Sequence, residues 1–213
     1  MLRCKLHLAI HLATCFAIAG SGAASEPEDV EPPVKYTLIV DGKATEISEG
    51  KPVRLAGDFK SPEVSLKLDP NRTFKYAGVK FQYPRHFYFG ADLADNEARL
   101  WTLRGNDVNI MVADVEGYAT LTVFARSMAN NLGKGTVSFV DRKLNGKLGG
   151  HNLPGLKVKI TIGETESSME FYMIGKGGGR TRFLVFHDHT ATRSKDGDAA
   201  FTLLNDSFDI TRK

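Results

Sequence analysis

Two histidines near the end of the chain have the type and spacing that metal binding favours. His187 and His189 stand one residue apart in the stretch "FLVFHDHT", which begins with β-forming residues. Residues i and i+2 of a strand point to the same face of a sheet, so we expect both imidazoles to face one point. Two ligands are too few for zinc, which takes three or four from a protein.

Candidates for a third ligand are few, because only two more histidines lie beyond residue 25. His86 follows a predicted strand that ends at Pro84, and His151 lies in the loop "GGHNLPG". The metal hypothesis therefore places zinc or another divalent cation on His187 and His189, with His151 or His86 as a third ligand. The alternative hypothesis is that both histidines of the pair are exposed where the last strand ends.

A basic and aromatic stretch, "YPRHFYFG", is the best candidate for a partner-binding surface. Arginine and aromatic residues are enriched at protein interfaces. The candidate contact residues are Tyr83, Arg85, His86, Phe87 and Tyr88. The alternative is that the phenylalanines of this stretch fill the core at the end of a strand.

The sequence lacks several signatures of catalysis. It contains neither the Gly-x-Ser-x-Gly elbow of hydrolases nor the His-Glu-x-x-His of zinc proteases. The glycine-rich run "GKGGGR" joins two predicted strands and lacks the Lys-Ser/Thr of a phosphate-binding P-loop. We therefore expect a protein that is not an enzyme and has no cofactor, unless the histidine pair holds a metal.

Residues 1–25 have the three-part pattern of a secretory signal peptide. Arg3 and Lys5 precede an apolar run, and the small residues of "SGAAS" follow it. The alternative is an uncleaved membrane anchor, but the apolar run is short for a membrane span of about 20 residues. A lipid anchor at Cys15 is a second alternative. We expect export to the periplasm, the cell surface or the extracellular medium, with no membrane span after signal removal.

Cysteine content and charge narrow the function of the exported chain. Both cysteines, Cys4 and Cys15, lie in the predicted signal, so the mature chain has no disulfide, no cysteine–zinc site and no thiol nucleophile. Loss of Arg3 and Lys5 leaves 26 basic and 25 acidic residues, a net charge of +1. This balance lacks the basic footprint of a nucleic-acid-binding protein. We expect a protein partner, of unknown identity, and no nucleic acid.

Turn and strand patterns divide the mature chain into three parts. Residues 26–35 are acidic and proline-rich, which predicts an extended linker. Residues 36–70 predict a small β extension, with a hairpin turn at Asp41-Gly42. Residues 71–213 predict the main domain.

The main domain alternates groups of strands with two helices. Strands are predicted in "VKFQYP", "ARLWTL", "VNIMVADV", "TVSFVD", "GLKVKITIG", "SMEFYMIG" and "RTRFLVFH". Apolar spacing predicts one helix from Tyr118 to Leu132, stopped by Gly133. A second helix in "DGDAAFTLLNDSFDI" has Asp196 or Asp198 as its predicted cap. This order predicts an α+β fold with a mostly antiparallel sheet and two main helices.

From about Thr73 to Ile210 this order resembles the PsbP-like family, which includes the Ran-binding Mog proteins and DcrB-type exported proteins. The resemblance is carried by "FQYP", by "VNIMVADV" with the helix after it, and by "RTRFLVFHD" with a helix ending in "LLNDSF". It implies an α/β/α sandwich, here preceded by the β extension at 36–70. It also implies binding rather than catalysis, with partners that differ among members. We therefore expect an exported, non-enzymatic binding or accessory module that acts through protein–protein contacts.

Overall fold

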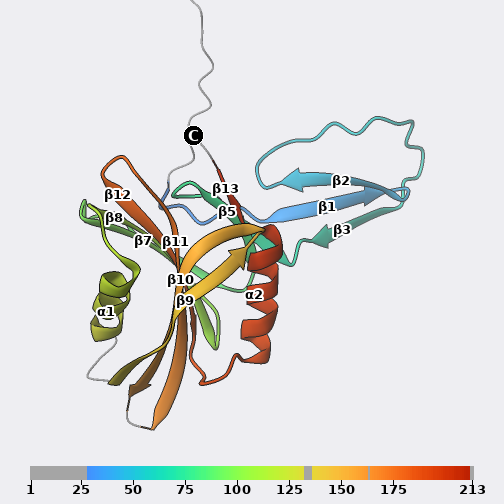
Figure 1. The fold of residues 1–213 in the computed structure, drawn as a ribbon. Coiled ribbons are helices and arrows are strands. Elements are labelled where there is room, and N and C mark those ends of the chain that lie inside the picture. Colours follow the sequence, from blue (N-terminus) through green and yellow to red (C-terminus); the bar gives the residue numbers. More distant parts are fainter. Residues whose placement is uncertain (1–27, 132–135, 163, 212–213) are drawn as a thin grey trace, which may run out of the picture.

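The body of the protein is built on a seven-stranded antiparallel sheet (Figure 1). The computed structural model describes residues 28–131, 136–162 and 164–211, so the predicted signal peptide and the predicted helix stop at Gly133 lie outside it. In spatial order the strands are β6 (Tyr88–Asp92), β7 (Ala98–Arg104), β8 (Val108–Glu116), β12 (Arg180–Asp188), β11 (Thr165–Gly177), β10 (His151–Ile162) and β9 (Thr136–Leu148).

The two helices lie on opposite faces of this sheet (Figure 1). α1 (Leu121–Asn131) packs on β10 and β11, and α2 (Lys195–Ser207) packs on β8 and β9. Because strand residues alternate between faces, β12 supplies both cores: Phe183 is buried on the α1 side and Leu184 on the α2 side. Within the described part of the chain, neither helix has the length and apolarity needed to cross a membrane.

A second, three-stranded sheet covers the α2 side of the core. β5 (Val79–Pro84) is its central strand and lies between β13 (Asp209–Ile210) and β4 (Asn71–Phe74). Phe81 and Tyr83 of β5 are fully buried, and Gln82 between them is exposed. The alternation predicted from "VKFQYP" is therefore confirmed.

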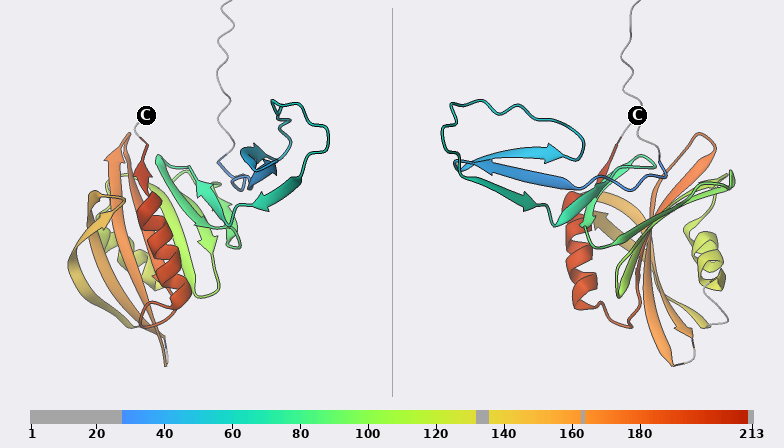
Figure 2. Two further views of the ribbon diagram at one scale, coloured as in Figure 1. Left: turned by 90° about the vertical axis from the view of Figure 1, so that its right-hand side faces the viewer. Right: turned by 180° about the vertical axis from the view of Figure 1, so that it is seen from behind.

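The first three strands form an appendage that extends to one side of the body (Figures 1 and 2). β1 (Lys35–Val40) is central, with β2 (Lys43–Ser48) on one side and β3 (Val64–Leu68) on the other. Asp41 and Gly42 join β1 to β2 with positive φ angles of 49° and 77°. A type I′ hairpin turn requires this conformation, and the Asp-Gly hairpin that the sequence predicts is present.

The segment before β1 lies along the body. We call residues 28–33 the strap. The indole Nε1–H of Trp101 donates a hydrogen bond to the main-chain oxygen of Glu28 at 2.7 Å, and the Tyr76 hydroxyl donates to that of Val30 at 2.5 Å. The described part of the predicted linker is thus held by side chains of the core rather than extending away from it.

The predicted fold class is wrong in its balance of strands and helices. The described part of the fold is 52% strand and 13% helix, so it is mostly antiparallel β and more β-rich than an α+β or α/β/α sandwich with two main helices. β9 and β11 each run for 13 residues, well beyond the apolar stretches that predict them. Polar residues such as Lys147 and Lys176 interrupt the apolar pattern, while the main-chain ladder continues past them.

Both helices begin at residues other than those predicted. The sequence predicts Tyr118 in the first helix, but α1 begins after it and Tyr118 is 76% exposed. Ser194, rather than Asp196 or Asp198, caps α2, because its hydroxyl accepts a hydrogen bond from the Gly197 N–H at 2.9 Å. A cap of this kind satisfies a main-chain donor that has no partner within the helix.

Candidate functional site

The two histidines of "FHDHT" lie side by side at the end of β12. Their ring centroids are 4.5 Å apart and the rings are inclined by 43°. His187 is the last strand residue but one and stands between Asn109 of β8 and Met169 of β11. His189 follows the strand and is exposed. The i, i+2 spacing therefore brings the two rings together as predicted. The ring of His187 is buried, and the ring of His189 is in solvent.

The buried ring of His187 is a neutral imidazole at neutral pH. His187 is only 8% exposed, and its Nε2 has no hydrogen-bond partner among the described residues. The pKa of His187 is lowered to about 4, mainly by burial and next by the neighbouring His189. The carboxylate of Asp188 raises this pKa, but by less. A neutral imidazole is the form that binds metals. The other ring is engaged, since Nε2 of His189 lies 2.9 Å from Nδ2 of Asn109.

No third ligand joins the pair in the described part of the chain. Among those residues, no group of three or more His, Cys, Asp or Glu side chains is placed to hold a metal ion. The ring of His151 packs on Phe208 after α2, and its Nε2 lies 3.5 Å from Asp209. The ring of His86 packs against Phe87, with the centroids 5.2 Å apart. The two sequence-based candidates are therefore committed to other neighbours.

Asp188, between the two histidines, has a structural environment. It is 1% exposed and points to the opposite face of the sheet. Its carboxylate accepts hydrogen bonds from the main-chain N–H groups of Thr190 and Ser194, each at 3.0 Å. These bonds fix the turn between β12 and α2, and the carboxylate is directed away from the imidazoles.

The aromatic and basic stretch does not form one exposed patch. Tyr83 is fully buried and Phe87 is 3% exposed, so both belong to the core. Arg85 is half-buried, while His86 and Tyr88 are exposed. Phe87 and Phe89 fill the core, as the alternative expects, and Tyr83 is buried as well. Arg85, His86 and Tyr88 retain surface to offer a partner.

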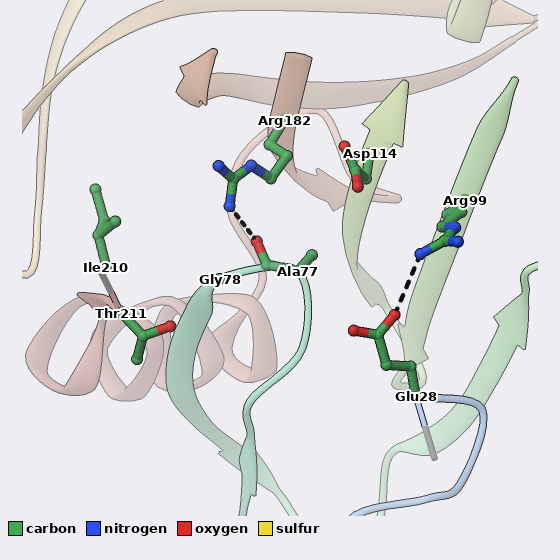
Figure 3. Close-up of a pocket in the computed structure, with 8 residues that line it drawn as sticks. All are labelled: Glu28, Ala77, Gly78, Arg99, Asp114, Arg182, Ile210 and Thr211. Carbon is green, nitrogen blue, oxygen red and sulfur yellow. Dashed lines mark hydrogen bonds and ion pairs between the residues drawn. The ribbon is translucent and has the colours of Figure 1, made fainter. Parts of the chain in front are cut away.

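A polar pocket lies beside the strap, where β7, β8 and β12 present charged residues on one face (Figure 3). Arg99, Asp114 and Arg182 are cross-strand neighbours in register, so they form a row. Glu28 of the strap points at this row from the other side, with a carboxylate oxygen 3.6 Å from Arg99. The pocket has a volume of about 560 Å³.

The charged groups of this pocket are engaged in ion pairs and hydrogen bonds. Asp114 pairs with Arg180 at 3.1 Å, and Arg182 donates a hydrogen bond to the main-chain oxygen of Ala77 at 3.0 Å. Its lining residues are Glu28, Ala77, Gly78, Arg99, Asp114, Arg182, Ile210 and Thr211. This set contains no cysteine, serine or histidine, and the arginines outnumber the acids once Asp114 is paired. The charge favours an anion over a cation.

The appendage carries the most exposed apolar strand among the described residues. Val64, Leu66 and Leu68 of β3 are 58%, 59% and 38% exposed. They are in register with apolar residues of β1 on the same side of the sheet. We call this side the apolar face; its members are Tyr36, Leu38, Val40, Ile47, Val64, Leu66 and Leu68. Val40 is only 6% exposed, so the exposed part of this face is the side of β3. Isolated apolar side chains are common on protein surfaces, but a contiguous exposed group marks an interaction site.

β3 is also an open edge. The N–H of Asp41 bonds to the oxygen of Glu63, and the N–H of Asp69 bonds to the oxygen of Lys35. Odd-numbered residues of β3 therefore direct their main-chain groups to β1. The even-numbered residues Val64, Leu66 and Leu68 direct theirs outward, and no strand of the described chain pairs with them. An edge of this kind is a template for another strand.

No protein-family model and no curated protein matches the chain.

Sequence reasoning placed β3 within the small β extension at residues 36–70 but did not predict its exposed surface. The stretch "PEVSLKLDP" shows apolar residues at alternate positions, which predicts one apolar side. The same pattern fits a strand that packs on the body. The apolar side of β3 remains exposed because the appendage extends away from the body (Figure 2).

Proposed function

We propose that the chain is an exported, non-enzymatic binding module that acts through protein–protein contacts at the appendage. The docking element is β3, and the occupant is an extended segment of a protein that adds to the sheet as its next strand. The observation that carries the proposal is the exposed edge of β3. Val64, Leu66 and Leu68 have exposed apolar side chains, and their main-chain N–H and C=O groups point away from β1.

The chemistry of β3 specifies the kind of segment. Main-chain hydrogen bonds to an edge strand supply affinity for any extended peptide, and the side chains supply selectivity. Apolar residues at alternate positions of the partner would lie beside Val64 and Leu66. Lys67 points to the other face and forms no ion pair with another described residue. A glutamate or aspartate opposite Lys67 therefore complements the edge.

A synthetic peptide tests this proposal. The probe is an acetylated peptide of alternating valine and threonine with one glutamate, and its binding is measured by fluorescence polarisation. Saturable binding by the protein supports the proposal. Leu66→Pro should abolish binding, because proline removes one outward N–H that β1 does not use.

Leu66→Thr is the matched control, since it keeps the N–H and removes part of the apolar side chain. It should weaken binding less than Leu66→Pro does. If the monomeric protein does not bind the peptide, or if Leu66→Pro binds as well as the unchanged chain, the edge is not a docking element.

Metal binding is the second candidate function. It is favoured by the 4.5 Å separation of the His187 and His189 rings and by the buried Nε2 of His187, which has no partner in the part of the chain that the structure describes. It requires a further ligand from outside the described residues or from a partner. Stoichiometric zinc in the purified protein, lost in a His187→Ala/His189→Ala double variant, would support this candidate. Equal and substoichiometric metal in both proteins would reject it.

A further inference from the structure

The β3 edge is self-complementary, which identifies a strand that fits it. We propose that β3 pairs antiparallel with β3 of a second copy of this chain, across a twofold axis at Ser65. This inference rests on the proposed function, because it names the partner of the same edge. The two appendages then form one continuous sheet in which β3 is central rather than exposed.

Hydrogen-bond geometry limits the possible registers. The outward main-chain groups of β3 belong to the even-numbered residues, so even residues of one copy must face even residues of the other. Pairing centred on Ser65 satisfies this condition, because Val64 then faces Leu66 of the second copy. Pairing centred on Leu66 or on Lys67 satisfies it as well. Main-chain geometry alone therefore leaves three central registers.

Charge selects one of these registers. With Ser65 on the axis, Glu63 of each copy lies opposite Lys67 of the other, which gives two opposite-charge cross-strand pairs. With Leu66 on the axis, Glu63 faces Asp69, and like charges directly opposite are destabilising. With Lys67 on the axis, the two lysines face each other. Neither Glu63 nor Lys67 forms an ion pair with another described residue, so both are available.

Symmetry and exposure support the same assembly. A twofold contact uses one patch on both copies, and the assembly closes at two chains. An exposed, apolar edge strand that stays uncovered is an aggregation site. Pairing of Val64 with Leu66 of the second copy covers the flanks of both side chains. A dimer of two chains therefore covers the free β3 edge of both copies and leaves no further β3 edge exposed.

Cross-linking at the axis tests the register. In this register two Ser65 residues form a non-hydrogen-bonded pair with Cα atoms about 4.5 Å apart, within disulfide range. In the full chain with Cys4→Ser and Cys15→Ser, we expect Ser65→Cys to give a covalent dimer under mild oxidation. Ala44→Cys is the matched control, since Ala44 is exposed in the same cross-strand row but on the opposite edge. It should remain monomeric.

Charge reversal provides a second test that keeps the natural chain length and fold. Lys67→Glu and Glu63→Lys should each weaken dimerisation at least tenfold in sedimentation experiments, because each places like charges opposite one another. The double variant Glu63→Lys/Lys67→Glu should restore it. Restoration is the decisive observation, because an unfolded or generally damaged variant would not recover.

The outcomes separate this inference from the proposed function. A protein that binds the strand peptide but stays monomeric, with no Ser65→Cys cross-link, overturns the self-pairing and keeps the edge as a site for another protein. Faster cross-linking of Lys67→Cys than of Ser65→Cys overturns the proposed register. Absence of both peptide binding and dimerisation overturns the two proposals together.

Discussion

At the residue scale, "FHDHT" divides its three polar side chains among three environments. His187 is buried beside Met169, with no described residue bonded to its Nε2, and His189 is exposed against Asn109. Asp188 holds the turn that starts α2. The i, i+2 rule gave the direction of each side chain correctly. It could not give their burial, because the neighbours on β8 and β11 are distant in the sequence.

The buried histidine predicts a pH dependence of stability. His187 titrates near 6.5 in the unfolded chain and near 4 in the folded one. Between these values the unfolded state binds more protons, so the free energy of unfolding falls as the pH falls from 6.5 to 4. The loss from this residue amounts to about 3 kcal/mol at pH 4 and is absent above pH 6.5.

His187→Leu should remove this part of the dependence, which urea denaturation at pH 7 and pH 4 measures. The exposed His189→Leu is the control and should retain most of it. An unchanged slope in His187→Leu would show that the imidazole is not buried as the structure places it.

At the element scale, the sequence predicted six of the seven strands of the main sheet, missed β6, and underestimated the lengths of several others. Buried strands such as β5 and β12 show their apolar pattern directly. The ends of β9 and β11 are polar, and the short strands β4 and β13 are too brief to show a period. The open edge of β3 was not predictable, because the pattern of one strand does not reveal whether another covers it.

The hairpin between β9 and β10 predicts a clear difference between adjacent glycines. Gly149 and Gly150 have positive φ angles of 57° and 80°. A side chain at Gly149 would also overlap the main-chain oxygen of Phe208, whereas Gly150 faces open space. We expect Gly150→Ala to cost about 1 kcal/mol from backbone strain and Gly149→Ala to cost more. Thermal denaturation measures both, and equal costs would contradict the contact between this hairpin and the end of α2.

At the scale of the whole molecule, the strap and the appendage are the two additions to the body. The strap is fixed by Trp101 and Tyr76 at the pocket side, and it leads directly into β1. The start of the appendage is therefore held against the core, while β3 remains open. Export and the identity of the partner remain predictions from the sequence and the exposed edge.

The single tryptophan reports on the strap. Trp101 is 1% exposed and donates to the Glu28 main-chain oxygen. Deletion of residues 28–33 should shift its emission to longer wavelength and increase quenching by acrylamide. Glu28→Gln is the control and should leave the emission unchanged, since it keeps the accepting oxygen. Unchanged emission after the deletion would contradict the docking of the strap.

Amide hydrogen exchange along β3, followed by NMR, tests the central claim most directly. In dilute protein the N–H groups of Ser65 and Lys67 should be protected by β1, while those of Val64, Leu66 and Leu68 exchange rapidly. Binding of the strand peptide, or concentration of the protein, should protect the even-numbered residues as well. Protection of all five in dilute protein, or no gain on adding either strand, would contradict the account of β3 as an open docking edge.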